Sequence, residues 1–178
     1  MADPAIGQIF NFLPISERLA TAGQPTREQF AAIGSDGYGL VINLAPSDSS
    51  NAIANEEQLV AENGMRYVHI PVDWKAPRLE DLTRFFEVME QNREQKVFVH
   101  CAMNLRVSSF VYLYRVLRLN EPEPEAALPL NEIWGRVAVY AKGSAPESTA
   151  VAVANSFYQP DGIWRRFIDQ ALAAKFWC

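Results

Sequence analysis

Residues 96–110 read Lys-Val-Phe-Val-His-Cys-Ala-Met-Asn-Leu-Arg-Val-Ser-Ser-Phe and join a strand pattern to a helix pattern. Its first part, from Val97 to His100, is a short apolar run rich in β-branched and aromatic side chains, which is typical of a buried strand. Beyond Arg106, apolar residues recur at helical spacing, namely Val107, Phe110, Val111, Leu113, Tyr114 and Leu117. The stretch therefore predicts a strand that ends just before Cys101 and a helix that begins soon after it.

The junction between that strand and that helix is a favourable place for an anion. The first backbone N–H groups of a helix are unpaired, and the helix dipole is positive at that end. The same features stabilise a thiolate at Cys101. Arg106 adds a permanent positive charge and a planar fork that matches two oxygens of a phosphate. A nucleophile, a set of amides and an arginine so close together suit attack on a bound oxyanion.

The motif His-Cys, four residues, Arg and then Ser resembles the signature of cysteine-dependent protein phosphatases. More closely, the chain resembles a small bacterial family of dual-specificity-like phosphatases, whose relatives also occur fused to β-lactamase-like hydrolases. The segments that carry this resemblance lie in roughly the first two-thirds of the chain. They are Ala22–Thr26, Val41–Leu44, Ile70–Asp73 and His100–Ser108.

The resemblance implies a phosphatase that hydrolyses phosphate monoesters of the phosphotyrosine or phosphoserine type, without a metal or any other cofactor. Cys101 would be the nucleophile and would form a phosphocysteine, while Arg106 would hold the phosphate oxygens. The rest of the phosphate-binding loop would be Ala102, Met103, Asn104, Leu105 and Ser108. The expected substrate is a phosphorylated protein or a small phosphoester.

Two of these loop residues also have simpler explanations. Ser108 either stabilises the departing sulfur by hydrogen bonding or bonds the helix backbone, as serines in a first turn often do. Asn104 stands where phosphatases usually have glycine. Asn is the residue other than Gly that best tolerates the left-handed backbone region, so we expect its role to be conformational.

Asp73 is the candidate general acid. It stands in a loop, Pro71 to Pro77, directly after a predicted strand and one strand before Cys101 in the chain. Phosphatases of this kind carry an acid at that place, and protonation of the leaving oxygen lowers the barrier to ester cleavage. The alternative is a solvated loop carboxylate.

The spacing between Cys101 and Arg106 leaves two other functions open. Most cysteine phosphatases have five residues between these positions, whereas this chain has four. Four is also the spacing of rhodanese-type sulfurtransferases, in which the cysteine carries a persulfide. A third possibility is a non-catalytic phosphate-binding regulatory domain. A persulfide mechanism needs no general acid, so Asp73 discriminates between the two enzymes.

Strand and helix patterns alternate along the chain, which predicts an α/β fold with a mostly parallel sheet and helices on both faces. Asn43, Asp73 and Cys101 all fall at or just past predicted strand ends, where such sheets bind their ligands. We further predict one or two edge strands in 8–20. Helix N-caps are expected at Thr26 (with Gln29), Asn55 and Asp161. A loop or break is expected at 120–129, a helix over 130–142, and a loop at 142–148.

Composition fits a single globular domain over residues 1–178. Hydrophobic content is 49%, charged content is 21% and the net charge is −5, so a general nucleic-acid binder is not expected. No apolar run is long enough to span a membrane, and the start of the sequence lacks a signal peptide, so we expect a cytoplasmic protein. Two histidines, His69 and His100, and one internal cysteine do not make a metal site. We expect Cys178 to be an ordinary free thiol.

Overall fold

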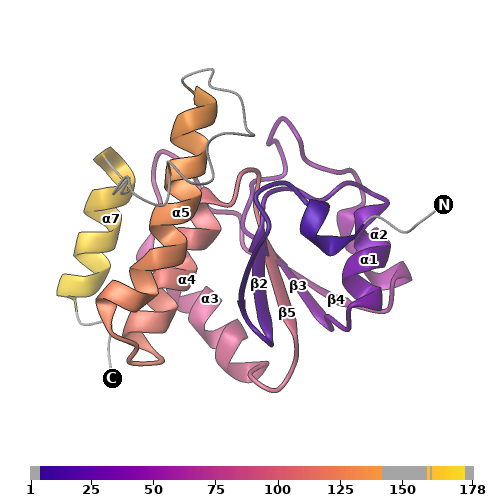
Figure 1. The fold of residues 1–178 in the computed structure, drawn as a ribbon, viewed down its shortest axis with the longest axis horizontal. Helices are drawn as coiled ribbons and strands as arrows, with labels where there is room; N and C mark the ends of the chain where they lie inside the picture. The colour runs from indigo at the N-terminus through magenta and orange to yellow at the C-terminus, as the bar shows by residue number, and fades with distance from the viewer. Residues whose placement is uncertain (1–4, 142–159, 161, 175–178) are drawn as a thin grey trace.

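The computed structural model describes residues 5–141, 160 and 162–174 (Figure 1). Three sequence predictions concern residues outside these ranges: the free thiol of Cys178, the loop at 142–148 and the cap at Asp161. Within the described ranges, no helix is both long and apolar enough to cross a membrane.

The centre of the molecule is a five-stranded sheet in the order β1-β2-β5-β3-β4. β1 (Leu13–Ser16) pairs antiparallel with β2 (Leu19–Ala22), and all other pairs are parallel. β5 (Val97–His100) lies between β2 and β3 (Leu40–Asn43), and β4 (Arg66–His69) forms the other edge. The strand that precedes Cys101 is therefore the central strand, paired on both sides.

Helices cover both faces of this sheet (Figure 1). A short 3-10 helix, η1 (Ile6–Gln8), precedes β1. The helices of one face are α1 (Gln29–Ser35) and α2 (Glu56–Glu62). Those of the other are α3 (Leu79–Gln91), α4 (Leu105–Leu117), α5 (Glu123–Ala141) and α7 (Gly162–Ala173). The predicted α/β fold, a mostly parallel sheet between two helical layers, is confirmed.

Side chains alternate along the central strands between two apolar cores. Val41 and Phe98 pack in the cluster with α1 and α2, whereas Ile42 and Val99 pack in the larger cluster with α3 and α4. All four are fully buried. Strands buried on both faces read as continuous apolar runs, which is why these short segments could be recognised in the sequence. The same alternation places Cys101 on the side of the larger cluster.

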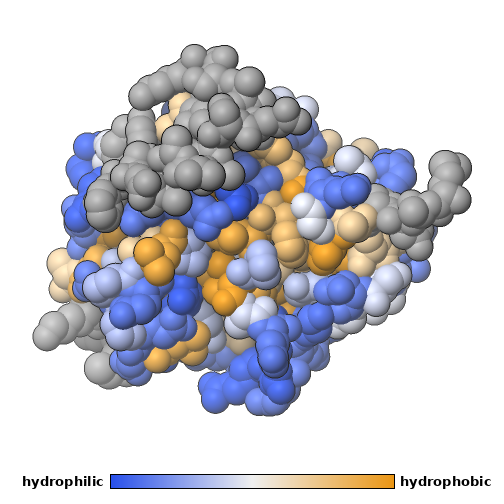
Figure 2. Space-filling view, viewed as in Figure 1, coloured by the Kyte–Doolittle hydropathy of each residue, from blue (hydrophilic) through white to orange (hydrophobic). Residues whose placement is uncertain are grey.

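α4 is the most deeply buried helix of the larger layer. It packs against α5 and α7, and its residues from Val107 to Tyr114 are all buried. Phe110 is central, because its ring stacks on Phe167 of α7 at 5.6 Å and meets Phe85 of α3 edge-on at 5.7 Å between centroids. The outer surface combines a hydrophobic central region on one face with hydrophilic residues on both sides (Figure 2).

Two sequence predictions on element positions need correction. Of the strands at 8–20, β1 lies at a sheet edge as predicted, but β2 lies inside the sheet between β1 and β5. The predicted loop at 120–129 is wrong beyond 122, because α5 already begins at Glu123. Pro124 stands in its first turn, where no backbone N–H is needed, so proline favours the helix start there. Pro129 is accommodated within the helix.

Two predicted N-caps form only in part. The Thr26 N–H donates to Gln29 Oε1 at 2.9 Å, which is half of a capping box, but α1 begins at Gln29 itself. Asn55 occupies the N-cap position of α2 with φ +59° and makes no capping hydrogen bond. A capping side chain reaches the helix amides from extended backbone, and a left-handed residue points elsewhere. Gly64 follows the end of this helix with φ +76°, a left-handed conformation that glycine adopts without strain.

Replacing Phe110 by Ala tests the packing of α4. Because the ring is fully buried between α3 and α7, its removal should lower the free energy of unfolding by about 3–5 kcal/mol, measured by urea denaturation. Leu128→Ala on α5 is the control, since Leu128 is 67% exposed and its loss should cost within about 0.5 kcal/mol. Equal losses in the two variants would contradict this account of the core.

Candidate active site

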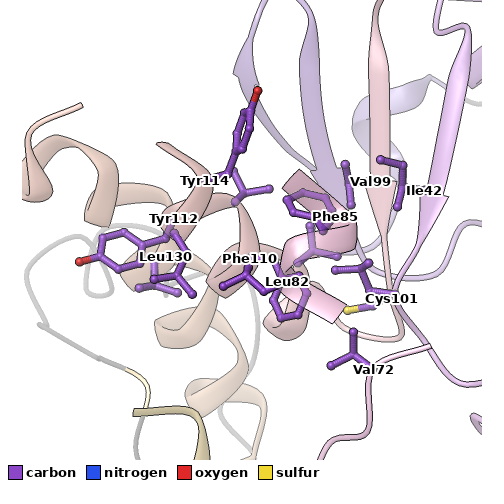
Figure 3. Close-up of a cluster of buried hydrophobic side chains, with 14 of the residues drawn as sticks. Ile42, Val72, Leu82, Phe85, Val99, Cys101, Phe110, Tyr112, Tyr114 and Leu130 are labelled. Atoms are coloured by element: carbon purple, nitrogen blue, oxygen red, sulfur yellow. The ribbon is translucent and has the colours of Figure 1, made fainter. Parts of the chain in front are cut away.

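Cys101 follows the last residue of β5 at the carboxyl edge of the sheet, as predicted. Its backbone N–H donates to the carbonyl of Ala22 on β2 at 3.4 Å, so the chain is still guided by the sheet at this point. The side chain is only 1% exposed and belongs to the larger apolar cluster together with Val72 and Leu82 (Figure 3). The side chain is therefore buried at the start of the loop that follows.

Asn104 fixes the shape of that loop. It has φ +69°, the left-handed conformation expected from the sequence, and α4 begins at the next residue. Its Nδ2 donates to the carbonyl of Asn11 at 2.8 Å and to Thr21 Oγ1 at 2.9 Å, and the side chain is fully buried. Asn11 Nδ2 in turn donates to the carbonyl of Met103 at 3.1 Å. The turn between β5 and α4 is thus held by residues that flank β1 and lie on β2.

The carbonyl of Ala102 is held away from the loop interior by two donors. The Gln24 N–H reaches it at 3.3 Å and Asn51 Nδ2 at 3.1 Å. Gly23 is needed for this approach, because a Cβ there would lie 3.1 Å from the same carbonyl and 2.7 Å from Phe10. Within the described chain, the amides of Ala102, Met103, Leu105 and Arg106 have no hydrogen-bond acceptor. These N–H groups are therefore available to an anion.

Arg106 lies in the first turn of α4 and has no carboxylate partner among the described residues. Its Nε is buried and makes no hydrogen bond. Its guanidinium carbon lies 5.4 Å from the ring centre of Trp74, which is the neighbour of Asp73. The structure therefore brings the arginine of the Cys101 loop against the loop that carries the candidate acid. A buried donor without a partner, on a permanently charged group, is suited to bind an anion.

The Asp73 loop is anchored by a group of tryptophans. The Trp74 ring lies 6.0 Å from that of Trp134 on α5 and 5.1 Å from that of Trp164 on α7. Trp164 Nε1 also donates to the Trp74 carbonyl at 3.1 Å. Asp73 itself is exposed, and its Oδ1 accepts the N–H of Lys75 at 2.8 Å. The sequence analysis missed this anchor, because Trp134 and Trp164 look like ordinary helix residues in the sequence.

The Ser108 hydroxyl donates to the carbonyl of Leu105 at 3.0 Å, and Ser109 does the same at 3.0 Å. This is the backbone bonding considered for Ser108 from the sequence, and the Ser108 oxygen can still accept a hydrogen bond. His69 Nε2 lies 2.7 Å from the carbonyl of Ala45. In the part of the chain that the structure describes, no group of three or more His, Cys, Asp and Glu residues could hold a metal ion.

A second feature missed by the sequence analysis is a buried carboxylate on the opposite side of β5. Glu56, the first residue of α2, is 5% exposed and lies 3.0 Å from Nε2 of the fully buried His100. Its carboxylate also accepts from Asn43 Nδ2 at 2.8 Å and from Gln24 Nε2 at 2.6 Å. Asn43 contacts the Tyr67 hydroxyl at 3.1 Å. One carboxylate therefore joins β3, β5 and the segment after β2, directly beside Cys101.

Burial alone would raise the pKa of the Glu56 carboxyl. The hydrogen bond to His100 and the electrostatic interaction with it, together with hydrogen bonds from Gln24 and Tyr67, outweigh burial and hold the pKa below its ordinary value of 4.5. The carboxylate is thus the form that the fold stabilises. No local sequence pattern indicates that Glu56 is a buried carboxylate, since it looks like one of several acidic residues at a helix start.

Known proteins resemble this chain over most of its length. The family model described as DSP-PTPase phosphatase fused to NAD+ Kinase matches residues 14–142. The beta-lactamase hydrolase-like protein of Xylella fastidiosa is 32% identical over 117 residues, which are 63% of this chain and 27% of that protein. The chain thus spans about a quarter of the length of the curated relatives it matches.

Several solved structures share the fold, and two of them serve as examples. A putative phosphatase (DUF442) from Shewanella putrefaciens CN-32 is 29% identical and has a TM-score of 0.75, with 96% of each chain covered. TpbA of P. aeruginosa, solved in complex with pTyr, is 15% identical and has a TM-score of 0.57, with 83% of this chain and 92% of that one covered. The second similarity concerns the fold alone.

The Glu56 site makes a prediction about stability and pH. Since the pKa of Glu56 is lowered on folding, its contribution is present above the unfolded value and is lost as pH falls through the folded one. The free energy of unfolding of the wild type should therefore fall more steeply between about pH 5 and pH 3 than that of Glu56→Gln. The measurement is urea denaturation at a series of pH values. Glu57→Gln, at the exposed neighbour, should keep the wild-type slope; parallel profiles for all three proteins would refute the assignment.

Proposed function

This chain belongs to the family of DSP-PTPase phosphatases that is described as fused to NAD+ kinase, and from this membership we propose that it is a cysteine-dependent, metal-independent phosphomonoesterase. The observation that carries the proposal is the unpaired Arg106 beside the free loop amides. These groups can hold the equatorial oxygens of a phosphoryl group, where the charge of the transition state lies. Cys101, at the start of the same loop, would be the nucleophile.

In the first step the Cys101 thiolate attacks phosphorus, and the bond from phosphorus to the alcohol oxygen breaks. The Asp73 carboxyl gives its proton to that oxygen, so the alcohol leaves neutral. In the second step water, deprotonated by the Asp73 carboxylate, attacks the phosphocysteine and releases phosphate and the thiolate. The contact between Arg106 and Trp74 supports this pairing, because it places the loop of the acid against the phosphate-binding loop.

We further propose that the enzyme accepts both aryl and alkyl phosphates, as a dual-specificity phosphatase does. Its substrate would be a phosphorylated protein or a small phosphoester. Two large apolar side chains are exposed here, Met103 (37% exposed) in the loop and Phe10 (39% exposed) next to Gly23, and an aryl leaving group could bind to them. The pTyr complex of TpbA concerns a protein of the same fold and supports only that such a fold can hold an aryl phosphate.

Sulfur transfer remains the second candidate, because four residues separate Cys101 from Arg106. A persulfide on Cys101 would use the same amides, but no oxygen leaves that needs a proton. Asp73 then has no chemical task, and the anchoring of its loop by Trp74 would be structural only.

Replacing Cys101 by Ser tests the nucleophile. A serine hydroxyl is not ionised in this loop, so the hydrolysis of p-nitrophenyl phosphate should fall to background. The control is Cys178→Ser, which should keep wild-type turnover. A parallel thiosulfate–cyanide assay tests the second candidate. Phosphatase activity that persists in Cys101→Ser would contradict the proposed mechanism.

Replacing Asp73 by Asn tests the acid. General acid catalysis typically contributes about 10²–10⁴-fold, and this contribution is needed most when the leaving alcohol is a poor leaving group. Asp73→Asn should therefore slow alkyl and phenyl phosphates by a factor that approaches this range and p-nitrophenyl phosphate much less. The readout is the slope of log kcat/KM against leaving-group pKa. Asp36→Asn, at the opposite end of the sheet, is the control; identical slopes in wild type and Asp73→Asn would remove the acid from the mechanism.

A further inference from the structure

The loop that carries Asp73 is exposed, yet a distant helix holds it. Val72 is the last buried residue before this part of the loop, and its N–H donates to the Leu44 carbonyl at 3.1 Å. From Asp73 to Ala76 every residue is exposed. Packing in an apolar core therefore does not fix this part of the loop. The hydrogen bond that reaches it from far along the chain comes from Trp164 of α7.

Trp164 contacts Trp74 through both its N–H group and its ring. Its Nε1 donates to the Trp74 carbonyl at 3.1 Å, and the two ring centroids lie 5.1 Å apart. Trp164 is itself only 2% exposed and meets the Phe167 ring edge-on at 5.6 Å. A side chain packed in this way is held in one rotamer, so it is a rigid donor. It fixes the backbone of the residue that follows Asp73.

The Trp74 side chain connects this anchor to the phosphate-binding loop. Its ring centre lies 5.1 Å from that of Trp164 and 5.4 Å from the guanidinium carbon of Arg106. A cation near the face of an indole is attracted to it. Trp74 is therefore held by α7 through its carbonyl and contacts, through its ring, the arginine that would bind the phosphate. Asp73 is placed between these two constraints because it is the neighbour of Trp74 in the chain.

A general acid needs this kind of placement. It must come within about 2.6–3.2 Å of the oxygen that it protonates, and small errors of position are costly for the rate. The contact that Asp73 makes itself, from the Lys75 N–H at 2.8 Å, is local and moves with the loop. That contact cannot set the distance between the carboxyl group and a phosphate held at Arg106. The hydrogen bond from Trp164 can, because α7 packs against α4, the helix that carries Arg106.

We infer that Trp164 is a positioning residue of the proposed reaction: its hydrogen bond to the Trp74 carbonyl holds the Asp73 carboxyl group within reach of the leaving oxygen. This inference rests on the proposed phosphatase function. It makes α7 a part of the active site, although α7 lies outside the residues 14–142 that the family model matches. Trp164 acts only through Trp74 and Asp73, and the chemical step remains with Asp73.

Cleavage by trypsin after Lys75 measures the anchoring independently of activity. Trp164→Phe keeps an aromatic ring in the core but removes the N–H that holds the Trp74 carbonyl. Because a loosely held exposed loop is nicked faster, cleavage of the native variant after Lys75 should be about three- to tenfold faster than in the wild type. Ile168→Val, at another buried residue of α7, is the matched control and should keep the wild-type rate. Equal rates in wild type and Trp164→Phe, or equal acceleration in both variants, would overturn the anchor.

The slope of log kcat/KM against leaving-group pKa measures whether the anchor serves the acid. Trp164→Phe should lower kcat/KM about three- to tenfold for phenyl phosphate and less than about twofold for p-nitrophenyl phosphate, so the slope becomes steeper. Ile168→Val should keep the wild-type slope. In the Asp73→Asn background no acid is left to position, so Trp164→Phe should change the slope no further.

The outcomes separate this inference from the function on which it rests. Faster loop cleavage with an unchanged slope, in an enzyme that Cys101→Ser inactivates, would overturn the positioning role and leave the phosphatase function standing. A further change of slope in the Asp73→Asn background would also overturn it, because Trp164 would then act by another route. If the wild type hydrolyses no phosphoester, the proposed function fails and the positioning role fails with it, whatever the cleavage rates.

Discussion

The left-handed turn at Asn104 is the constraint on which the site depends. A strand that enters a helix within four residues must reverse its backbone direction sharply, and Asn104 does so with φ +69°. Its side chain makes this conformation specific, because it bonds both Asn11 and Thr21. Glycine would allow the same φ but would supply neither bond. Glycine would only permit the turn, whereas the buried Asn104 side chain also anchors it. The loop amides are left without acceptors as a consequence of this conformation.

The two sides of β5 are held by different kinds of interaction. Toward α1 and α2, the Glu56 carboxylate collects donors from His100, Asn43 and Gln24. Toward α3 and α4, the contacts of Cys101 are apolar. A buried carboxylate is costly unless its hydrogen bonds are complete, so the polar side specifies one arrangement of the strand ends. The thiol on the other side then has a fixed position relative to the amides that would bind its substrate.

Sequence patterns predicted the parts of this structure that depend on local interactions. The buried strands 40–43 and 97–100, the helix after Cys101 and the conformation of Asn104 each have a signature within a few residues. The early start of α5 was missed because prolines at 122, 124 and 129 favour a loop in isolation, whereas packing against α4 stabilises the helix. Glu56 and the tryptophan anchor of Trp74 were missed for another reason. Their partners lie 44 and 90 residues away in the chain, and no spacing rule connects them.

The four-residue spacing between Cys101 and Arg106 does not by itself exclude a phosphate site. Moving an arginine one place earlier on a helix rotates it by about 100° and shifts it about 1.5 Å toward the loop. Side chains of a first turn point back toward the helix N-terminus, so such an arginine still reaches the loop that precedes it. Trp74 then constrains where the Arg106 side chain lies, because the Trp74 ring centre is 5.4 Å from the guanidinium carbon. The direction of Arg106 is thus set by the loop of Asp73 as well as by α4. A sulfurtransferase would have no use for that link, whereas a phosphatase needs the arginine and the acid in one place.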